Sequence, residues 1–186
     1  MKALLVKYKP VIKFILTFLV VYYALSFSYK FYLDFSDGSL YYPDYMTHLV
    51  AKQSESLLNS VGYNTTVSPH PDEPSIIMIV NGKYVARVIE GCNSVSVIIL
   101  FLSFILAFAG SFKMTFLYIL AGSVLIYAAN LVRIVVLTIG LYEYPWRRDI
   151  LHTVIFPLII YGMVFILWMF WVNRFSKNKR ARVATS

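Results

Sequence analysis

The sequence predicts an all-α membrane protein of about four transmembrane helices, with an extracytoplasmic α+β segment between the first and second. Three observations predict this fold. Of the 186 residues, 59% are hydrophobic and 14% are charged, whereas soluble domains are about a quarter charged. The mean hydropathy is +0.68. Four long apolar runs alternate with short polar stretches, and seven of the nine acidic residues lie in one polar segment, 29–91. We therefore expect a single integral membrane domain over 1–186.

The first apolar run covers residues 11–28. About 17–25 apolar residues are needed to cross a bilayer, so this run suffices as a span. A cleaved signal peptide is the alternative, with Ala24-Leu25-Ser26 as the processing site. The bulky Tyr22, Tyr23 and Phe27 around that site favour a retained span. In either case the chain emerges on the far side of the membrane at about residue 29.

The polar segment 29–91 predicts an amphipathic helix and a β-hairpin. Asp44 is placed to cap a helix that starts near Tyr45, and Gly62 suits its C-terminal end. Residues 63–68 are a candidate strand. Asn81-Gly82 separates two apolar runs, 75–80 and 83–90, and this dipeptide is a strong hairpin signal. The apolar positions at helical spacing are Met46, Leu49, Val50, Leu57, Leu58 and Val61.

Three further spans are expected at about 93–110, 114–139 and 150–172, with Pro157 kinking the last of them. The basic residues cluster at the two ends of the chain, which favours cytoplasmic termini and a basic cytoplasmic tail over 173–186, expected to be disordered. Because the net charge of +8 comes from residues that flank spans, the expected partner is the lipid bilayer and not nucleic acid. Residues 29–91 and 140–149 then face outward.

This topology brings three reactive side chains to one depth of the membrane. The only cysteine, Cys92, is expected in the first turn of a span that descends from the outside. His152 begins another span from the same side. Arg133 lies in the span between them, about 9 Å below its outward end at a rise of 1.5 Å per residue.

Cysteine, histidine and arginine together suit acyl transfer. A thiol becomes a nucleophile when a helix N-terminus or a nearby cation favours its ionised form. An imidazole can carry the proton, and a guanidinium can stabilise an oxyanion. Each residue also has a plainer interpretation: Cys92 as an apolar filler, Arg133 as a snorkelling side chain, and His152 as a polar residue at a helix start. Their coincidence at one depth favours catalysis.

Other polar residues are weaker candidates. Arg87 and Asn93 flank the cysteine, where they would orient it or contact a substrate. Arg147 and Arg148 would contact an anionic lipid or a substrate carboxylate, unless they are simply interface charges. His48 and His70 lack a convincing ligand partner, so neither a metal nor another cofactor is expected.

Three segments carry a resemblance to a known family. The stretch Arg-Val-Ile-Glu-Gly-Cys-Asn, 87–93, enters an apolar run; Asn130-Leu-Val-Arg133 lies late in the next; and His152 opens another. This order resembles the exosortase/archaeosortase family, most closely the small type found in Bacteroidetes, often called exosortase F. The resemblance implies a catalytic Cys92, Arg133 and His152, with Asn130 as a further substrate-binding candidate. Typical members have more spans than this chain.

The resemblance also implies a function. Such a protein would be a membrane-embedded cysteine protease or transpeptidase, which cleaves C-terminal sorting signals of secreted proteins through an acyl-thioester and transfers them to an acceptor. Its partners would be membrane-tethered proteins that end in a motif, a span and a basic tail. An accessory membrane protein stays open as a further partner. The location would be a bacterial inner membrane, with the site facing the periplasm. A non-enzymatic scaffold or accessory subunit and a lipid acyltransferase are the alternatives.

Overall fold

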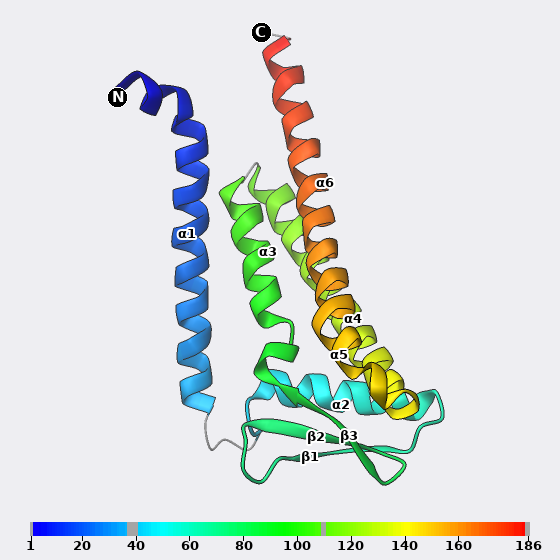
Figure 1. Ribbon diagram of the computed structural model, residues 1–186. Coiled ribbons are helices and arrows are strands. Elements are labelled where there is room, and N and C mark those ends of the chain that lie inside the picture. The colour runs from blue at the N-terminus through cyan, green and yellow to red at the C-terminus, as the bar shows by residue number, and fades with distance from the viewer. Residues whose placement is uncertain (1, 37–40, 109–110, 185–186) are drawn as a thin grey trace.

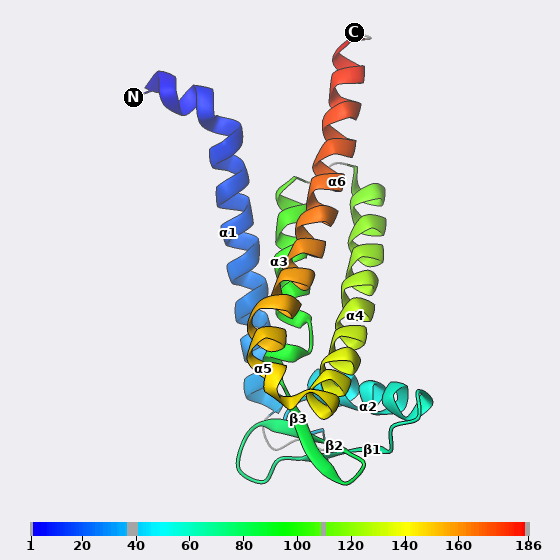
Figure 2. The same ribbon diagram turned by 45° about the vertical axis from the view of Figure 1, so that its right-hand side comes forward.

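The computed structural model describes residues 2–36, 41–108 and 111–184, with side chains for all of these except 2–7, 148, 151–152, 156 and 175–184. Four helices, α1, α3, α4 and α6, run alongside one another, and helix α2 with a three-stranded sheet closes one end of them (Figures 1 and 2). The start of α1 (Lys2–Ser36) and the end of α6 (Phe156–Ala184) lie together at the opposite end.

Among the described residues, three helices are long and apolar enough to cross a membrane: α1, α4 (Phe112–Glu143) and α6. The second expected span, 93–110, forms the shorter helix α3 (Val95–Ala107). Its 13 residues extend only about 20 Å at 1.5 Å per residue, against a hydrocarbon core of about 30 Å. It starts two residues later than expected because Asn93 and Ser94 form a turn.

The long helices expose apolar side chains. No residue in the apolar window of α1 is buried inside the protein, and Leu16, Val20, Leu120 and Ile166 are each more than half exposed. A water-soluble protein rarely presents such a large apolar surface. These faces are therefore the surface that meets lipid, as the composition predicts.

Helix α2 (Tyr45–Ser60) forms where the sequence predicts it. Asp44 caps it by accepting a hydrogen bond from the backbone N–H of Thr47, and Gly62 follows its end with a φ of +95°. The buried face differs from the expected one: Leu57 and Val61 are 41% and 59% exposed. The stripe that packs on the sheet and α4 consists instead of Thr47, Val50, Ala51, Ser54 and Leu58.

The sheet is antiparallel, in the order β1 (Thr65–Pro69), β2 (Ser75–Val80), β3 (Lys83–Ile89). Asn81 and Gly82 join β2 to β3 with φ angles of 50° and 77°. Positive φ at both central residues is what a type I′ hairpin turn requires. One core unites α2, β2, β3 and α4 through residues that include Val50, Met78 and Ile134. This core sets the position of α4 relative to β3.

A second core lies deeper in the bundle, between α3, α4 and α6. Its buried members are Phe101, Ile105, Ile126, Val164 and Trp171. Helix α1 packs on the outer side of α3, where Phe14 meets Phe108 and Phe18 meets Phe104 with ring centroids 4.3 and 4.6 Å apart. The bundle therefore has α3 at its centre, although α3 is its shortest helix.

Helices α1, α4 and α6 extend beyond the expected spans. The last turn of α4 reaches the sheet, where Tyr142 accepts a hydrogen bond from Asn81 and Glu143 accepts one from Tyr63. Before α6, the chain forms η2 (Pro145–Arg147), α5 (Arg148–Ile150) and the π-helical turn η3 (Leu151–Ile155). Pro157 follows this turn and has no N–H to continue an α-helical ladder through it.

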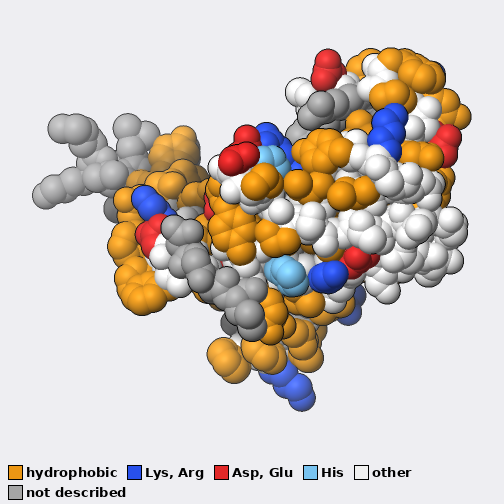
Figure 3. All heavy atoms as spheres, turned by 90° about the horizontal axis from the view of Figure 1, so that it is seen from below, with side chains coloured by type: hydrophobic (Ala, Val, Ile, Leu, Met, Phe, Trp, Pro, Cys, Tyr) orange, Lys and Arg blue, Asp and Glu red, His pale blue; other side chains and the backbone are white. Residues whose placement is uncertain are grey.

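The basic tail expected to be disordered from Asn173 is instead helical, as α6 continues to Ala184. The sequence from Asn173 to Ala184 contains no proline or glycine, so nothing in it breaks a helix. At the other end of the molecule, the surface is mixed. Seen from the sheet end, charged side chains of both signs lie among polar and hydrophobic ones (Figure 3), as expected for a face in contact with water.

Candidate functional site

Cys92 lies at the junction of the sheet and the bundle. Strand β3 leads into the 3₁₀ turn η1 (Glu90–Cys92), and α3 begins three residues after the cysteine. The prediction that Cys92 sits in the first turn of a membrane span is therefore wrong, because it lies in η1, before α3 begins. The N-cap, Ser94, has a φ of 67°, and this left-handed conformation separates the two helical segments.

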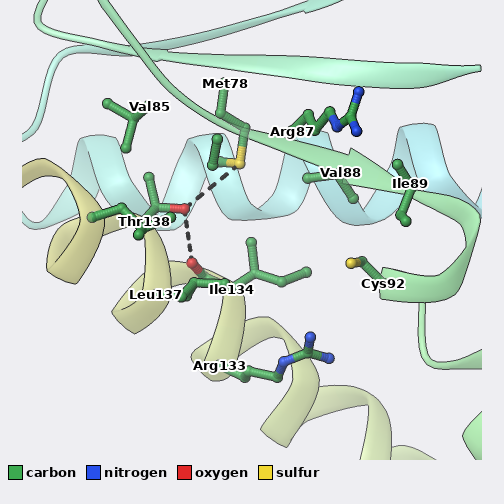
Figure 4. A pocket seen from close by; sticks show the side chains of 12 residues that line it. Met78, Val85, Arg87, Val88, Ile89, Cys92, Arg133, Ile134, Leu137 and Thr138 are labelled. Atoms are coloured by element: carbon green, nitrogen blue, oxygen red, sulfur yellow. Dashed lines mark hydrogen bonds between the residues drawn. The ribbon is translucent and has the colours of Figure 1, made fainter. Parts of the chain in front are cut away.

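Cys92 and Arg133 line the same cavity. It has a volume of about 180 Å³ and lies between β3 and the last third of α4. In Figure 4 the Cys92 sulfur and the Arg133 guanidinium both turn into this space, one from η1 and the other from α4. Apolar residues such as Val88, Ile134 and Leu137 form much of the remaining wall. The two predicted groups thus line the same, largely apolar pocket.

Asn130 connects these two groups. Its Nδ2 donates to the Cys92 carbonyl at 2.7 Å, and its Oδ1 accepts from Arg133 Nη1 at 3.1 Å. The residue is 1% exposed. Asn130 thus holds η1 and the guanidinium in one arrangement, and a direct contact between Asn130 and substrate stays a prediction.

Asn93 connects the cysteine-bearing turn to two other helices. Its Nδ2 is shared between Tyr29 Oη of α1, at 2.7 Å, and Thr47 Oγ1 of α2, at 3.1 Å. Its Oδ1 accepts from the Val95 N–H. The side chain is fully buried and engaged within the protein, so its contact with substrate also stays a prediction.

Arg133 retains hydrogen-bonding capacity. Its Nε is buried and has no hydrogen-bond partner within the described part of the chain. A buried guanidinium N–H without a partner is costly, and it is the type of donor that stabilises a developing oxyanion. Arginine in an apolar helix is by default a functional residue. The cavity therefore offers a thiol and a cationic donor to the same ligand.

Of the other predicted arginines, Arg87 lines the cavity and forms an ion pair with Glu73. Both side chains are about half exposed, so the pair contributes little to stability. The side chain of Arg148 lies outside the described residues. No group of three His, Cys, Asp or Glu side chains in the described ranges could hold a metal ion.

His152 belongs to the π-helical turn η3. The ribbon views place the α5–η3 segment at the same end of the bundle as η1 and at the same level (Figures 1 and 2). Its side chain lies outside the described residues. The structure therefore brings Cys92 and Arg133 together, and the approach of the His152 imidazole to them remains a prediction.

The linking residues were the part of the site hardest to predict. Asn130 and Arg133 are three residues apart, a spacing that places both on one helix face. Their hydrogen bond could therefore have been predicted from the sequence. The bond from Asn93 to Tyr29 joins residues 64 apart on elements whose packing the sequence does not reveal. The hydrogen bond from Asn93 to Thr47 was also not predicted, because a threonine was not expected on the buried face of α2.

Comparison with known proteins gives one match. The model of the transmembrane exosortase family matches residues 4–174, a range that includes nearly all of α1, all of α3 and α4, α6 as far as Arg174, and every residue of the site. No curated protein and no solved structure matches. The match is to the family as a whole, so assignment to the small Bacteroidetes type stays a prediction. Since the match covers nearly the whole chain, this protein belongs to the transmembrane exosortase family.

Proposed function

We propose that this protein is a membrane-embedded cysteine protease or transpeptidase. It would cleave C-terminal sorting signals from secreted proteins and transfer the shortened proteins to an acceptor. One observation carries the proposal: the Cys92 sulfur and the Arg133 guanidinium turn into one cavity at the end of the bundle. Membership of the exosortase family supports a cysteine transpeptidase in general. The roles of individual residues are part of the proposal.

In the proposed reaction, Cys92 attacks the carbonyl carbon of the scissile peptide bond. The thiol proton passes to His152, and Arg133 stabilises the oxyanion that forms on the carbonyl. When the C–N bond breaks, His152 returns the proton to the departing amine, and the acyl group stays on sulfur as a thioester. A nucleophile of the acceptor then attacks the thioester, gives its proton to His152 and releases the thiolate, which recovers that proton.

The proposed location is a bacterial inner membrane, with both termini in the cytoplasm and the site facing the periplasm. The start of α1 and the end of α6 lie at one end of the bundle and the cavity lies near the other, which agrees with that arrangement. A substrate that ends in a motif, a span and a basic tail would hold its scissile bond just above its own span. Pairing of the two proteins in the bilayer would then supply proximity.

The experiment is co-expression with a reporter that ends in a motif, a span and a basic cluster, taken from the same genome. The wild-type protein should shorten the reporter. Cys92→Ala and His152→Ala should abolish shortening, and Arg133→Ala should slow it about 10²–10³-fold, the loss typical of one oxyanion donor. Arg174→Ala is the matched control, since Arg174 lies in α6 outside the cavity lining, and it should process normally.

A Cys92→Ala variant that processes the reporter as fast as wild type would refute the enzyme and favour a scaffold or accessory subunit. Mass spectrometry of the trapped adduct on Cys92 distinguishes a transpeptidase from the remaining alternative, a lipid acyltransferase. A peptide fragment on sulfur supports the transpeptidase, whereas a fatty acyl chain would identify a lipid acyltransferase and contradict the proposal.

A further inference from the structure

The cavity lies along strand β3 and reaches the edge of this strand as well as one face of the sheet, where Met78 of β2 lines it. Five consecutive residues of this strand, Val85 to Ile89, line it. Successive side chains of a strand point to opposite faces, so a cavity against one face would be lined by every second residue. Contact with all five means that the cavity extends from this face to the backbone edge of the strand.

This edge has no partner strand. β3 is the last strand of the sheet and pairs only with β2. No backbone hydrogen bond connects the outer edge of Lys83–Ile89 to another described segment. Val85 is also the extra residue of a bulge, because Met78 pairs with Ala86 and Ile79 pairs with Tyr84. A free strand edge presents a row of N–H and C=O groups that another extended chain can pair with.

Helix α4 forms the opposite wall. Arg133, Ile134, Leu137, Thr138 and Leu141 line the cavity, and their spacing places them on one helix face. At about 180 Å³, the space is smaller than the roughly 300–1,000 Å³ of typical small-molecule pockets, so it would enclose only part of an extended peptide and leave the rest at the open surface. The cavity is therefore a narrow groove between a strand edge and a helix, and Cys92 lies at its end where β3 enters the bundle (Figure 4).

We propose that an extended segment of a polypeptide substrate pairs with the free edge of β3 as a fourth strand, and so delivers its scissile bond to Cys92. This inference rests on the proposed function, which makes the substrate a membrane-tethered chain. Strand addition to a sheet edge is a general mode of peptide recognition, in which the main chain gives affinity and alternate side chains give specificity. The continuity of the groove with the cysteine selects a peptide as its occupant.

The direction of the added strand follows from the substrate's attachment. β3 runs from the hairpin turn toward Cys92. The segment that precedes the scissile bond comes from the water-facing side, and the substrate's own span lies beyond the bond. It must therefore run parallel to β3. Every second side chain of the segment would pack against the wall that contains Leu137 and Leu141, so the recognition motif should carry apolar or small residues at alternate positions.

Disulfide cross-linking tests this arrangement. Cys92→Ser removes the only cysteine, and Val85→Cys or Ile89→Cys then places a single thiol at either end of the groove. A cysteine is moved along the reporter upstream of its cleavage site. Cross-links should recur at every second reporter position, and the position that reacts with Ile89→Cys should lie about four residues after the one that reacts with Val85→Cys. A period of three to four residues, the reverse order or no cross-link would overturn the inference.

A second variant tests the groove in the active protein. Leu141→Trp should fill the end of the groove distant from Cys92, raise KM for the reporter about tenfold and leave the rate of Cys92 alkylation by N-ethylmaleimide unchanged. Leu120→Trp is the control, because Leu120 lies on the same helix but is 54% exposed on its outer side. Equal KM values for these two variants would contradict the inference.

Failure of the inference and failure of the proposed function give different results. If the wild-type protein shortens the reporter but the cross-links lack the two-residue period, the groove assignment is wrong and the enzyme stands. If the two-residue period appears but the wild-type protein does not shorten the reporter, the groove binds an extended chain and the proposed chemistry is wrong.

Discussion

Asn130 donates a 2.7 Å hydrogen bond from its side-chain amide to the backbone carbonyl of Cys92, 38 residues earlier in the chain. The same side chain accepts a hydrogen bond from Arg133. One buried amide thus sets the position of the nucleophile-bearing turn relative to the guanidinium. In the proposed reaction this makes Asn130 a positioning residue, because it acts through its two neighbours and does not line the cavity.

Asn130→Ala should lower kcat of reporter processing about tenfold or more. The substitution removes two hydrogen bonds and leaves the Cys92 carbonyl without its partner, at a cost of about 1–3 kcal/mol, and 1.4 kcal/mol corresponds to a tenfold change in rate. KM should change little, since the groove along β3 is intact. Steady-state kinetics of the reporter, with the rate of Cys92 alkylation as a second readout, checks this prediction.

The control is Asn59→Ala. Asn59 also makes two hydrogen bonds, to the backbone N–H and carbonyl of Thr65, but it joins α2 to β1 away from the cavity. It should lose thermal stability and keep kcat. Equal kcat values for the two variants at matched stability would show that Asn130 has only a structural role.

Tyr29→Phe should destabilise the protein by about 1 kcal/mol, the usual net value of one hydrogen bond. The lost hydroxyl accepts the 2.7 Å hydrogen bond from Asn93. Tyr32→Phe is a matched control one turn along α1, because its hydroxyl is buried without a partner in the described part of the chain, and its loss should be neutral or slightly stabilising. Thermal unfolding in detergent compares the two. A larger loss for Tyr32→Phe would contradict the Asn93 network.

Local signals predicted much of the fold. Asp44 and Gly62 bound α2, and Asn81-Gly82 places the hairpin, because each depends on the conformation of a few consecutive residues. The ends of the long helices were less predictable. Hydropathy marks where lipid should end, but α4 continues to Glu143 because its last turn packs and hydrogen-bonds against the sheet. The late start of α3 depends on the left-handed Ser94, a residue type that does not usually adopt that conformation.

The candidate site was predicted to a similar extent. Counting spans placed Cys92 and Arg133 at one depth, and the structure puts them in one cavity. Counting spans did not predict that β3 would pass beside α4, because the position of β3 depends on how α2 orients the sheet. The sequence makes Asn93 and Asn130 candidates for substrate contact, with Asn93 alternatively orienting the cysteine, since it shows that a polar residue is near a site but not which way the side chain points.

Gly82→Ala should destabilise the hairpin by about 1 kcal/mol. Gly82 has a φ of +77°, yet an added Cβ would meet no atom within 4 Å, so the whole effect comes from the left-handed backbone. Gly162→Ala in α6 is the control, since it also has open space and no positive φ. It should be neutral or stabilising by up to about 1 kcal/mol, the difference in helix propensity. Thermal unfolding of both variants checks the opposite signs, and a shared sign would contradict this account.

Gly122→Ala should destabilise the packing of α3 against α4 by about 1–3 kcal/mol, the usual cost of overfilling a core. A Cβ at Gly122 would lie 2.3 Å from the ring of Phe101. Phe101 is fully buried, with Ile105 and Ile126 in the same core, so the ring has little room to move aside. Small residues at helix crossings let membrane helices approach closely, and Gly122 provides that approach here.

The double variant Gly122→Ala with Phe101→Leu isolates this contact. Leucine is shorter than phenylalanine and removes the ring atoms that the new methyl group would meet. Phe101→Leu alone should destabilise the protein by leaving a cavity. The double variant should lose less unfolding free energy than the two single variants do together, by about 1 kcal/mol or more. If the losses measured by unfolding in detergent are additive, the Phe101 ring is not the reason that position 122 requires glycine. Because only Asn93 and Ser94 separate η1 from α3, Gly122→Ala should also alter the alkylation rate of Cys92, whereas the double variant should restore it.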